Sequence, residues 1–591
     1  MEEINMDFNI CGIKFTVATD YKIDLTPIEN KDGILLIKIA LTLPKKQTPE
    51  KVRIDWELPL DDIISQWSPE GDFTNALKNE LMPEWSPVKI NSRSASGVPM
   101  ILHLNQRGIN RISTSLRDVR TPCVISAGVF EETACIHFKL NLFTETISEI
   151  STYETELRID TRAVPFYDAA DAVQKYWAQD YDTAHIPNEA RLPMYSTWYS
   201  MHQQLETSDL LAELKIAKDY GMDTVIADDG WQTDDNSRGY AYCGDWEPTP
   251  NKIPDMKALV DGVHALGMKY MMWYSVPFVG IHSRAYERFK GMYLSDRKNG
   301  IFVLDPRYPE VRDYLCKTYE DAVNNWGLDG LKLDFIDSFS LTEQSSAPNE
   351  RMDYESLEDA ICALLAEIKE RLVKLNPEIL IEFRQSYVGP IMRSCGNMLR
   401  VWDCPADILK NRVSGLNLRF SSGNSAIHSD MLMWHTDASC QAAALQIINI
   451  MFLVPQISVR IERLPQSHKD MLKFYMNLWR ANRECLLDGK LTAENPEASY
   501  SLAASELNGE LFVVTYSKNY LKTDKEYAKI TLVNGAWSEV TVIDNKYGEY
   551  TAHIRIWDCT GKVKSEYDSI IATGLNAFEI PDSGVMEIIR K

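Results

Sequence analysis

Apolar residues follow two different rhythms along the chain, and the rhythm changes near residues 190 and 490. The first part contains short alternating or β-branched runs such as GIKFTVAT, KVRIDWELPL and YETELRID, separated by turn residues. A strand that covers one face of a core has this period of two, so the pattern is typical of an antiparallel β-sandwich. Similar runs, among them GELFVVTYS and AHIRIWD, return near the C-terminal end. We therefore predict a second, smaller sandwich there.

Between the two sandwiches, strand runs alternate with amphipathic helices. The helix 310–326 ends at Gly327 and leads directly into LKLDFID, which is a common way to build a helix-to-strand loop. Eight strand runs occur in this zone: MYSTWYS, TVIADD, KYMMWYS, LKLDFID, ILIEFRQS, MLRVWD, NSAIHSD and QISVRIE. Eight such units predict a (β/α)₈ barrel. The alternative is a doubly wound open sheet, but no GxGxxG or P-loop follows any of the strands.

The predicted fold class is therefore α/β plus β, in three domains. An N-terminal β-sandwich covers residues 1–187, a (β/α)₈ TIM barrel covers 188–490, and a small C-terminal β-sandwich covers 491–591. No low-complexity linker separates these segments, so we expect the domains to pack on one another.

The composition narrows the class of protein. Of the 591 residues, 45% are hydrophobic and 25% are charged, which is typical of a globular protein. The net charge of −23 repels phosphate backbones, so we expect no nucleic-acid partner. No stretch approaches the roughly 18 apolar residues of a membrane span, so we expect no membrane partner either.

The N-terminal run and the cysteines predict a cytoplasmic location. MEEINMDFNI has acidic residues where a signal peptide carries basic ones. The 11 cysteines include no CxxC pair, and an odd number without a signal peptide indicates reduced thiols. No His/Cys spacing indicates zinc, and we expect neither a metal nor another cofactor.

Charged residues gather where the predicted strands end. A barrel enzyme builds its site at the C-terminal ends of its strands. The charged residues at these ends are Asp228, Asp229, Lys332, Asp334, Glu382, Arg384, Asp403 and Asp430. The sequence thus predicts a carboxylate-rich site at one mouth of the barrel.

The run LKLDF gives the sharpest indication of chemistry. Side chains alternate along a strand, so Lys332 and Asp334 share the face that looks into the barrel. A buried carboxylate beside a buried ammonium is costly unless it is paired or has a task. One interpretation is a structural ion pair. The other is that Lys332 keeps Asp334 ionised as a glycosidic nucleophile and donates to a substrate hydroxyl.

A retaining glycosidase needs a second carboxylate, about 5–5.5 Å from the first, as general acid/base. Asp403 ends the sixth strand, two strands from Asp334, and we expect Trp402 and apolar surroundings to raise its pKa. Asp407 is a rival, although it equally suits a helix cap or a partner for Arg412.

Four further residues are candidates for sugar binding. Asp228 and Asp229 suit bidentate hydrogen bonds to hydroxyl groups, or alternatively an Asx-turn. Trp273 on the third strand and Trp198 on the first are placed to stack on apolar sugar faces, or are plain core residues.

Several motifs, in this order, resemble glycoside hydrolase family 36, the melibiase-type α-galactosidases. They are ADDGWQ with a following GDW, the KYMMWYS strand, GLKLDF, and RVWDCPADILKNR continued by SGNSAIHSDMLMWH, spread over about residues 190–440. The predicted order of domains also agrees with the family. The resemblance implies a retaining α-galactosidase that acts on terminal α-galactosyl residues of small oligosaccharides. It also makes a homo-oligomer an expectation.

The resemblance assigns roles residue by residue. It implies Asp334 as nucleophile and Asp403 as acid/base. The residues that it places around the galactose are Asp228, Asp229, Trp198, Trp273 and Lys332. An arginine near the acid/base contacts substrate in the family, and Arg384 and Arg400 both remain candidates. Strand alternation favours Arg384, because Arg400 lies three residues from Asp403 and should face away in a regular strand. The family's arginine–aspartate motif favours Arg400.

Departures from the family pattern keep other functions open. The run from Trp273 to Phe278 lacks both acids of the family's Trp-x-Glu-Pro-Glu, and Trp402-Asp403-Cys404-Pro405 replaces a Ser-Asp pair. The alternatives are a retaining glycosidase for an α-N-acetylgalactosaminide or a β-L-arabinopyranoside, an α-galactosyl transglycosylase, and a non-catalytic sugar-binding protein.

Overall fold

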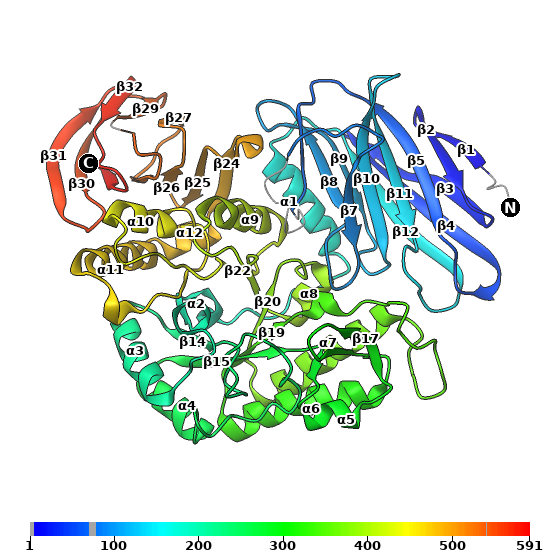
Figure 1. The fold of residues 1–591 in the computed structure, drawn as a ribbon. Coiled ribbons are helices and arrows are strands. Elements are labelled where there is room, and N and C mark those ends of the chain that lie inside the picture. The colour runs from blue at the N-terminus through cyan, green and yellow to red at the C-terminus, as the bar shows by residue number, and fades with distance from the viewer. Residues whose placement is uncertain (1–4, 70–78, 539) are drawn as a thin grey trace.

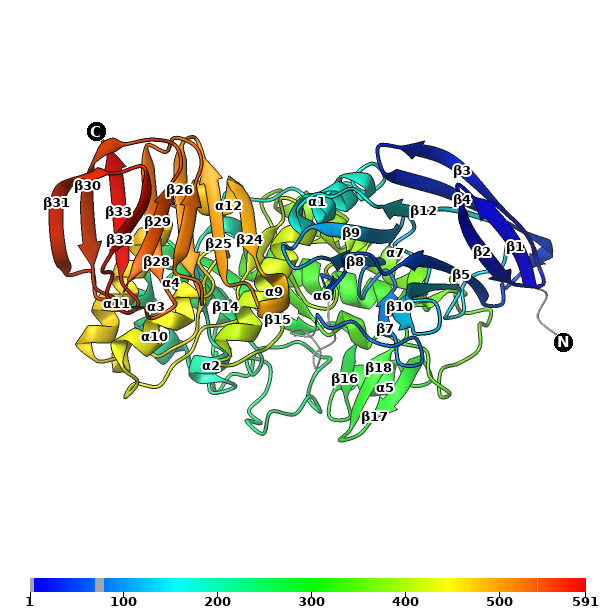
Figure 2. The same cartoon turned by 90° about the horizontal axis from the view of Figure 1, so that it is seen from above.

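The computed structural model describes residues 5–69, 79–538 and 540–591, and the acidic residues 1–4 lie outside this part. Figure 1 shows an N-terminal sandwich, a central barrel and a C-terminal β-domain. In the view from above, β1 and β31 mark opposite ends of the molecule (Figure 2). The predicted fold class is confirmed.

The N-terminal domain is a sandwich of antiparallel sheets. Their strand orders are β1-β2-β5-β11-β10-β7 and β3-β4-β12-β9-β8-β6. The bounds are β1 (Asn5–Ile10), β2 (Ile13–Ala18), β3 (Lys22–Lys31), β4 (Ile34–Gln47), β5 (Val52–Pro59), β6 (Ser65–Trp67), β7 (Val88–Ser92), β8 (Met100–Leu104), β9 (Asn110–Leu116), β10 (Cys123–Phe130), β11 (Cys135–Leu142) and β12 (Ile150–Asp160). In β4, Leu35, Ile37, Ile39 and Leu41 are buried in alternation, which is the period-two pattern of the sequence.

The central barrel consists of parallel strands, one from each of the eight predicted runs. Their bounds are β13 (Met194–Ser196), β14 (Thr224–Ala227), β15 (Lys269–Ser275), β19 (Gly330–Asp334), β20 (Leu380–Arg384), β21 (Met398–Arg400), β22 (Ala426–His428) and β23 (Gln456–Ile457). They follow one another in chain order, and β23 pairs with β13. A parallel bridge between His428 and Val454 brings the last two units together. The C-terminal strand ends therefore meet at one mouth.

Helices surround the barrel and link it to its neighbours. Their bounds are α1 (Phe166–Trp177), α2 (Trp198–Met201), α3 (Thr207–Asp219), α4 (Met256–Ala265), α5 (Arg284–Arg288), α6 (Pro309–Trp326), α7 (Leu357–Leu375), α8 (Pro390–Cys395), α9 (Ile408–Ser421), α10 (Cys440–Ile448), α11 (Gln466–Ala481) and α12 (Arg483–Asp488). Pro309 opens α6, and Gly327 closes it with φ 76°, as its sequence predicts. No helix in the described ranges is long and apolar enough to cross a bilayer.

Short insertions decorate the barrel. A small sheet of β16 (Phe278–Gly280), β18 (Ile301–Leu304) and β17 (Tyr293–Arg297) follows β15. The 3₁₀ turns are η1 (Asn188–Arg191), η2 (Ile336–Ser338), η3 (Ile461–Arg463) and η4 (Pro496–Ala498). Among these, η2 comes directly after β19 and so borders the mouth.

The C-terminal domain packs a larger sheet, β24-β25-β26-β28-β33-β30-β31, with a smaller one, β27-β29-β32. The bounds are β24 (Lys490–Glu494), β25 (Leu502–Leu507), β26 (Glu510–Thr515), β27 (Tyr520–Thr523), β28 (Lys529–Asn534), β29 (Thr541–Asn545), β30 (Tyr550–Trp557), β31 (Val563–Ile571), β32 (Gly574–Phe578) and β33 (Val585–Arg590). Two pairs, β26/β28 and β27/β29, run parallel, so the sheets are mixed.

All three domains meet in one buried hydrogen-bonded group. Trp67 of the N-terminal domain donates from Nε1 to Oδ1 of Asn417 on α9 at 3.1 Å. The hydroxyl of Tyr500, from the C-terminal domain, donates to the same oxygen at 2.5 Å. These polar groups are fully paired only when all three domains are in place.

Candidate active site at the barrel mouth

Asp334 is the last residue of β19 and lies in a dense set of donors. Arg384 donates from Nε to Oδ1 at 2.7 Å, and the Tyr387 hydroxyl donates to the same oxygen at 2.9 Å. Trp273 on β15 donates from Nε1 to Oδ2 at 3.0 Å. Burial alone would raise the pKa of Asp334, but the charges of Arg384 and Lys332 outweigh it and hold the pKa well below its usual value. The carboxylate is therefore ionised and fixed in orientation.

Lys332 on β19 contacts the end of β14, two strands away, rather than Asp334. Its Nζ donates to Oδ2 of Asp228 at 2.6 Å, and both side chains are buried. The sequence reasoning expected Lys332 to pair with Asp334. Trp273 and Arg384, on the adjacent strands β15 and β20, supply the direct contacts to Asp334 instead, and Lys332 contributes to its ionisation through its charge alone.

Asp228 and Asp229 follow β14 and face the same mouth. Asp229 accepts from Gln203 Nε2 at 2.6 Å and from Gln232 Nε2 at 2.7 Å. Burial raises the pKa of Asp229 to about 6, although these two hydrogen bonds oppose the shift. The two aspartates thus have separate sets of partners.

Asp403 lies beyond the end of β21 and pairs with Arg400. The Arg400 Nη2 to Asp403 Oδ1 distance is 2.8 Å, and the Asp403 side chain is 51% exposed. Burial raises the pKa of Asp403, yet the charge of Arg400 outweighs it, so the net shift is downward. Both sequence expectations on this point are wrong: the pKa is lowered, and Arg400 does not face away. The strand ends at Arg400, so the alternation rule does not extend to Asp403.

Arg400 also binds a second acid. Its Nη1 donates to Oδ1 of Asp430 at 2.6 Å, and its Nε lies 3.6 Å from Glu382 Oε1. Asp430 is fully buried and also accepts from the Tyr199 hydroxyl at 3.0 Å. Burial raises the pKa of Asp430 to about 6. Arg400 therefore shares its charge among several carboxyl groups.

The two candidate tryptophans lie in different settings. Trp273 is 1% exposed and its ring stacks near Tyr240, with centroids 6.0 Å apart. Trp198 is not on the first strand, because β13 ends at Ser196 and Trp198 begins α2. It remains partly exposed and contacts the His202 ring edge-on at 4.9 Å. Trp198 therefore lies at the rim of the barrel mouth, and Trp273 lies in its floor.

The rival acid Asp407 caps a helix. It accepts from the backbone N–H of Lys410 at 3.0 Å at the start of α9 and is exposed. Arg412, its suggested partner, donates instead to Asn449 and lies over the Tyr516 ring. The helix-cap interpretation accounts for Asp407.

The sequence reasoning missed polar side chains that support the acids. Each lies in the segment that follows a barrel strand, β13, β14 or β20, which is the signal that would have found them: Tyr199, Gln203, Gln232, Tyr240 and Tyr387. Tyr240 belongs to this set because the charges of Asp229 and Asp334, after burial, raise the pKa of its hydroxyl.

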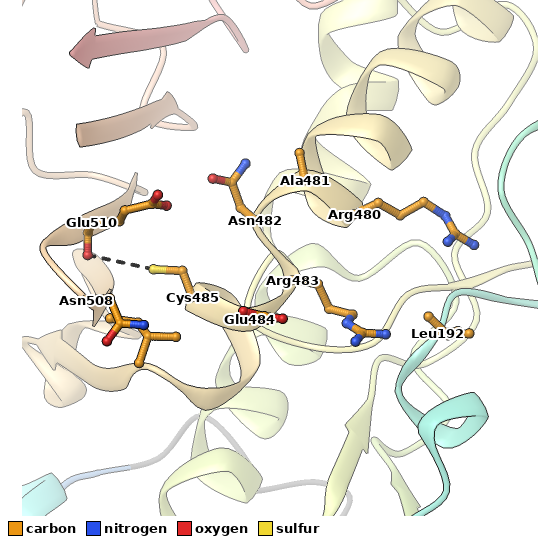
Figure 3. A pocket seen from close by; sticks show the side chains of 10 residues that line it. Leu192, Arg480, Ala481, Asn482, Arg483, Glu484, Cys485, Asn508 and Glu510 are labelled. Atoms are coloured by element: carbon orange, nitrogen blue, oxygen red, sulfur yellow. Dashed lines mark hydrogen bonds between the residues drawn. The ribbon is translucent and has the colours of Figure 1, made fainter. Parts of the chain in front are cut away.

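A separate cavity of about 430 Å³ lies between the barrel and the C-terminal domain. Figure 3 shows Arg480, Arg483 and Cys485 along its wall, with the Cys485 thiol directed at the Glu510 carbonyl oxygen. Its lining comes from α11, α12 and the turn between β25 and β26, with Leu192. This cavity is distinct from the carboxylate site at the mouth.

Comparison with known proteins agrees with this geometry. Residues 175–398 match the family model described as Melibiase. Alpha-galactosidase 2 of Pediococcus pentosaceus is 26% identical over 211 residues, which are 34% of this chain and 29% of that protein. The A type blood alpha-D-galactosamine galactosaminidase of Flavonifractor plautii is 25% identical over 169 residues, covering 25% of this chain and 15% of that protein. The matches thus span less than a third of these relatives.

Solved structures share the fold over nearly the whole chain. The GH36 alpha-galactosidase AgaA from Geobacillus stearothermophilus has a TM-score of 0.65 and 12% identity, covering 98% of this chain and 82% of that one. The alpha-galactosidase from Lactobacillus brevis has a TM-score of 0.64 and 15% identity, covering 100% and 84%.

The match to the Melibiase family model and the similarity to alpha-galactosidases indicate a glycoside hydrolase. Its central segment, residues 175–398, is a melibiase domain of the glycoside hydrolase family 36 type. The family resemblance of the sequence is confirmed.

Proposed function

We propose that the protein is a retaining, exo-acting α-galactosidase that removes terminal α-galactosyl residues through a covalent galactosyl-Asp334 intermediate. The observation that carries this proposal is the convergence of Arg384, Tyr387 and Trp273 on Asp334. These donors keep the carboxylate ionised and aimed at one point of the mouth, as a glycosidic nucleophile requires.

In the first step, Asp334 attacks the anomeric carbon while Asp403 protonates the departing oxygen. Asp403 is half exposed without substrate. A bound sugar covers it, and the loss of water raises its pKa, as does the negative charge of Asp334. Both effects favour the protonated form that a general acid needs, against the opposing charge of Arg400.

In the second step, Asp403 removes a proton from water, which attacks the galactosyl ester. Asp334 is uncharged while it is esterified, so it no longer raises the pKa of Asp403. Arg400, at 2.8 Å, then favours the carboxylate form. The same residue thereby changes from acid to base between the two steps.

The two acids that follow β14 bind the sugar itself. Asp228 and Asp229 supply acceptors for ring hydroxyls, and Lys332, on the nucleophile strand and paired with Asp228, supplies a donor. Trp273 offers an apolar floor, and Trp198 a rim. Two solved structures of variants of the similar AgaA are complexes with raffinose and with stachyose, which supports a small oligosaccharide as substrate here.

A second candidate is the same chemistry on an α-N-acetylgalactosaminide. The similarity to the Flavonifractor galactosaminidase favours it, as does the missing pair of acids between Trp273 and Phe278. Transglycosylation and non-catalytic sugar binding are lesser alternatives, which the experiment below separates. A β-L-arabinopyranoside substrate is a further alternative, which the same measurement on p-nitrophenyl β-L-arabinopyranoside tests.

The test is proton NMR of the protein with p-nitrophenyl α-galactoside and, in a parallel sample, with p-nitrophenyl α-N-acetylgalactosaminide. We expect α-galactose to appear first and to mutarotate later. Release of α-N-acetylgalactosamine alone would select the second candidate, and β-galactose as first product would refute retention. Galactosylated acceptors would reveal transglycosylation, while binding without release would indicate a sugar-binding protein.

A further inference from the structure

A turn of the N-terminal domain reaches the loops behind both catalytic candidates. Residues 93–99 connect β7 and β8, and Arg93 pairs with Ser96 across the turn. The Arg93 guanidinium donates from Nη2 to the carbonyl oxygen of Asp337 at 2.9 Å and from Nη1 to that of Phe339 at 2.7 Å. Arg93 therefore binds the η2 turn that follows the nucleophile strand.

That turn holds a strained backbone. Phe335, directly after Asp334, has φ 64° and ψ 20°, a left-handed conformation that a bulky residue rarely adopts. Such strain costs on the order of 1–3 kcal/mol and persists only when the surroundings impose it. The Phe335 N–H donates to Oδ1 of Asp334 at 2.8 Å, so the strained residue also orients the carboxylate.

The guanidinium is itself held in place. Its Nη1 lies 3.4 Å from Oε1 of Glu358 at the start of α7, and the Ser94 N–H donates to Oε2 of the same residue at 2.9 Å. The Arg93 side chain is 12% exposed and that of Glu358 is 3% exposed. A buried carboxylate that contacts both the Arg93 guanidinium and the adjacent backbone N–H fixes the geometry of the turn rather than merely adding charge.

The same turn contacts the loop after β20. The Gly97 N–H donates to the Ser386 carbonyl oxygen at 3.0 Å, and the two hydroxyls of Ser96 and Ser386 are 2.9 Å apart. The adjacent Gln385 accepts from the Trp402 N–H at 3.1 Å, next to Asp403. Gly97 has φ 69°, and a Cβ there would lie 2.0 Å from the Asn91 carbonyl oxygen. The turn thus depends on glycine for its close approach.

We propose that Arg93 is a positioning residue, which holds the Phe335–Phe339 turn from another domain so that Asp334 points at the anomeric carbon. This inference rests on the proposed function and adds a residue far from the barrel sequence to it. Because the contacts of Arg93 with the barrel loop that follows Asp334 are to backbone carbonyl oxygens, its loss should slow attack by the nucleophile more than it weakens substrate binding.

The test compares Arg93→Ala, Arg93→Lys and Ser96→Ala with the control Arg111→Ala, which removes an exposed ion-paired arginine of the same domain. We expect kcat of Arg93→Ala on p-nitrophenyl α-galactoside to fall by about 10–100-fold with KM nearly unchanged. Arg93→Lys should restore part of the activity, and Ser96→Ala should cause a smaller loss. An activated fluorinated galactosyl fluoride, which needs no acid, should label Asp334 more slowly by a similar factor.

A readout that does not require turnover separates this inference from the proposed function. Hydrogen exchange at the amides of residues 336–339 should accelerate in Arg93→Ala and Arg93→Lys but not in Arg111→Ala. If the wild-type protein neither cleaves the substrate nor is labelled, the proposed function is refuted. The exchange result then decides by itself whether Arg93 holds the Phe335–Phe339 turn. Exchange and labelling rates equal to those of the control would overturn the positioning role.

A separate observation concerns two thiols between the barrel and the C-terminal domain. Cys559, in the turn after β30, donates from Sγ to Sγ of Cys440 at the start of α10, and the sulfur atoms are 3.5 Å apart. Cys559 is buried, whereas Cys440 is partly exposed. The hydrogen bond from Cys559 lowers the pKa of the Cys440 thiol. Cys440 is thus the more accessible and the more acidic of the two.

We infer that Cys440 and Cys559 form a disulfide when the protein meets a peroxide. The Cys440 thiolate attacks one peroxide oxygen, the O–O bond breaks, and a sulfenic acid forms. Cys559 then attacks Cys440 Sγ, the S–O bond breaks and water leaves, so that two thiols and one hydrogen peroxide give one disulfide and two waters. The bond would tie α10 to the C-terminal domain.

The test is non-reducing peptide mapping after treatment of the intact protein with hydrogen peroxide. We expect a linked pair of peptides containing Cys440 and Cys559, two hydrogens lighter than their sum, that dithiothreitol separates. Cys440→Ser should abolish the link, while Cys395→Ser should leave it unchanged. Over-oxidation of Cys440 without a link would overturn the inference.

Discussion

Arg384 and Arg400 lie directly opposite each other on the adjacent parallel strands β20 and β21, yet their guanidinium groups bind different carboxylates. Arg384 binds Asp334, and Arg400 binds Asp403. Each proposed catalytic acid therefore has its own cation, and the two cations are fixed by one strand register. The sequence reasoning treated the arginines as rivals for one role, whereas the geometry gives each a separate role.

Loss of the nucleophile should remove turnover but allow chemical rescue. We expect Asp334→Ala to lower kcat by at least about 10⁴-fold, because no other group forms the covalent intermediate. Azide should restore part of the activity with p-nitrophenyl α-galactoside and yield β-galactosyl azide, since a single attack inverts the anomeric centre. NMR of the product checks this, and an α-azide would point to a different nucleophile.

Loss of the acid/base should depend on the leaving group. In Asp403→Ala, we expect substrates with poor leaving groups, such as raffinose, to lose about 10²–10⁴-fold in kcat/KM. Nitrophenyl substrates, which need little protonation, should lose far less. Asp407→Ala is the matched control, because it removes a nearby acid that caps α9. If the control shows the leaving-group dependence instead, Asp407 is the acid.

Removal of Arg384 should move the acid limb of the pH profile. Asp334 has to be ionised to attack, and Arg384 is the largest influence that lowers its pKa against burial. In Arg384→Met this charge is lost, burial dominates, and the pKa of Asp334 should rise. The acid limb of the kcat/KM profile should then lie at a higher pH than in the wild type. An unshifted limb would exclude this electrostatic role.

The raised pKa of Asp229 should appear in the stability of the substrate-free protein. Its pKa rises from 3.8 to about 6 on folding, so the folded state binds more protons between these values. The corresponding stabilisation is present below pH 4 and is lost as the pH rises to 6, by about 3 kcal/mol. In urea titrations from pH 4 to 7, the free energy of unfolding of the wild type should fall relative to that of Asp229→Asn as the pH rises. Asp235→Asn, in the same loop, serves as control.

Much of the architecture was predictable because the buried positions of a strand or helix recur at a regular spacing, which appears in the sequence as a periodic pattern of apolar residues. All eight barrel strands were found from apolar runs, and Gly327 correctly marked the end of α6. The ends of strands were harder to predict. Trp198 and Asp403 both lie just past a strand, in α2 and in an irregular loop, where alternation no longer predicts direction. The domain boundaries at 187 and 490 stay predictions.

Contacts between domains left no trace in the sequence pattern. Arg93 binds carbonyl oxygens of residues more than 240 positions away, and the backbone carbonyl that accepts a hydrogen bond is the same for every residue type. The partners of Arg400 were missed for a related reason. When several acids lie within reach of one cation, the three-dimensional geometry determines which of them it binds, and the spacing along the chain does not.

The shared oxygen of Asn417 limits how far the protein can be shortened. An isolated barrel would expose this side chain and a hydrophobic seam where Trp67 and Tyr500 now lie. Cutting away either flanking domain would also remove one of the two hydrogen bonds that the Asn417 oxygen accepts, at a cost of about 0.5–1.5 kcal/mol. A minimal version for engineering would therefore need a redesigned α9 surface, beginning with an apolar residue at position 417.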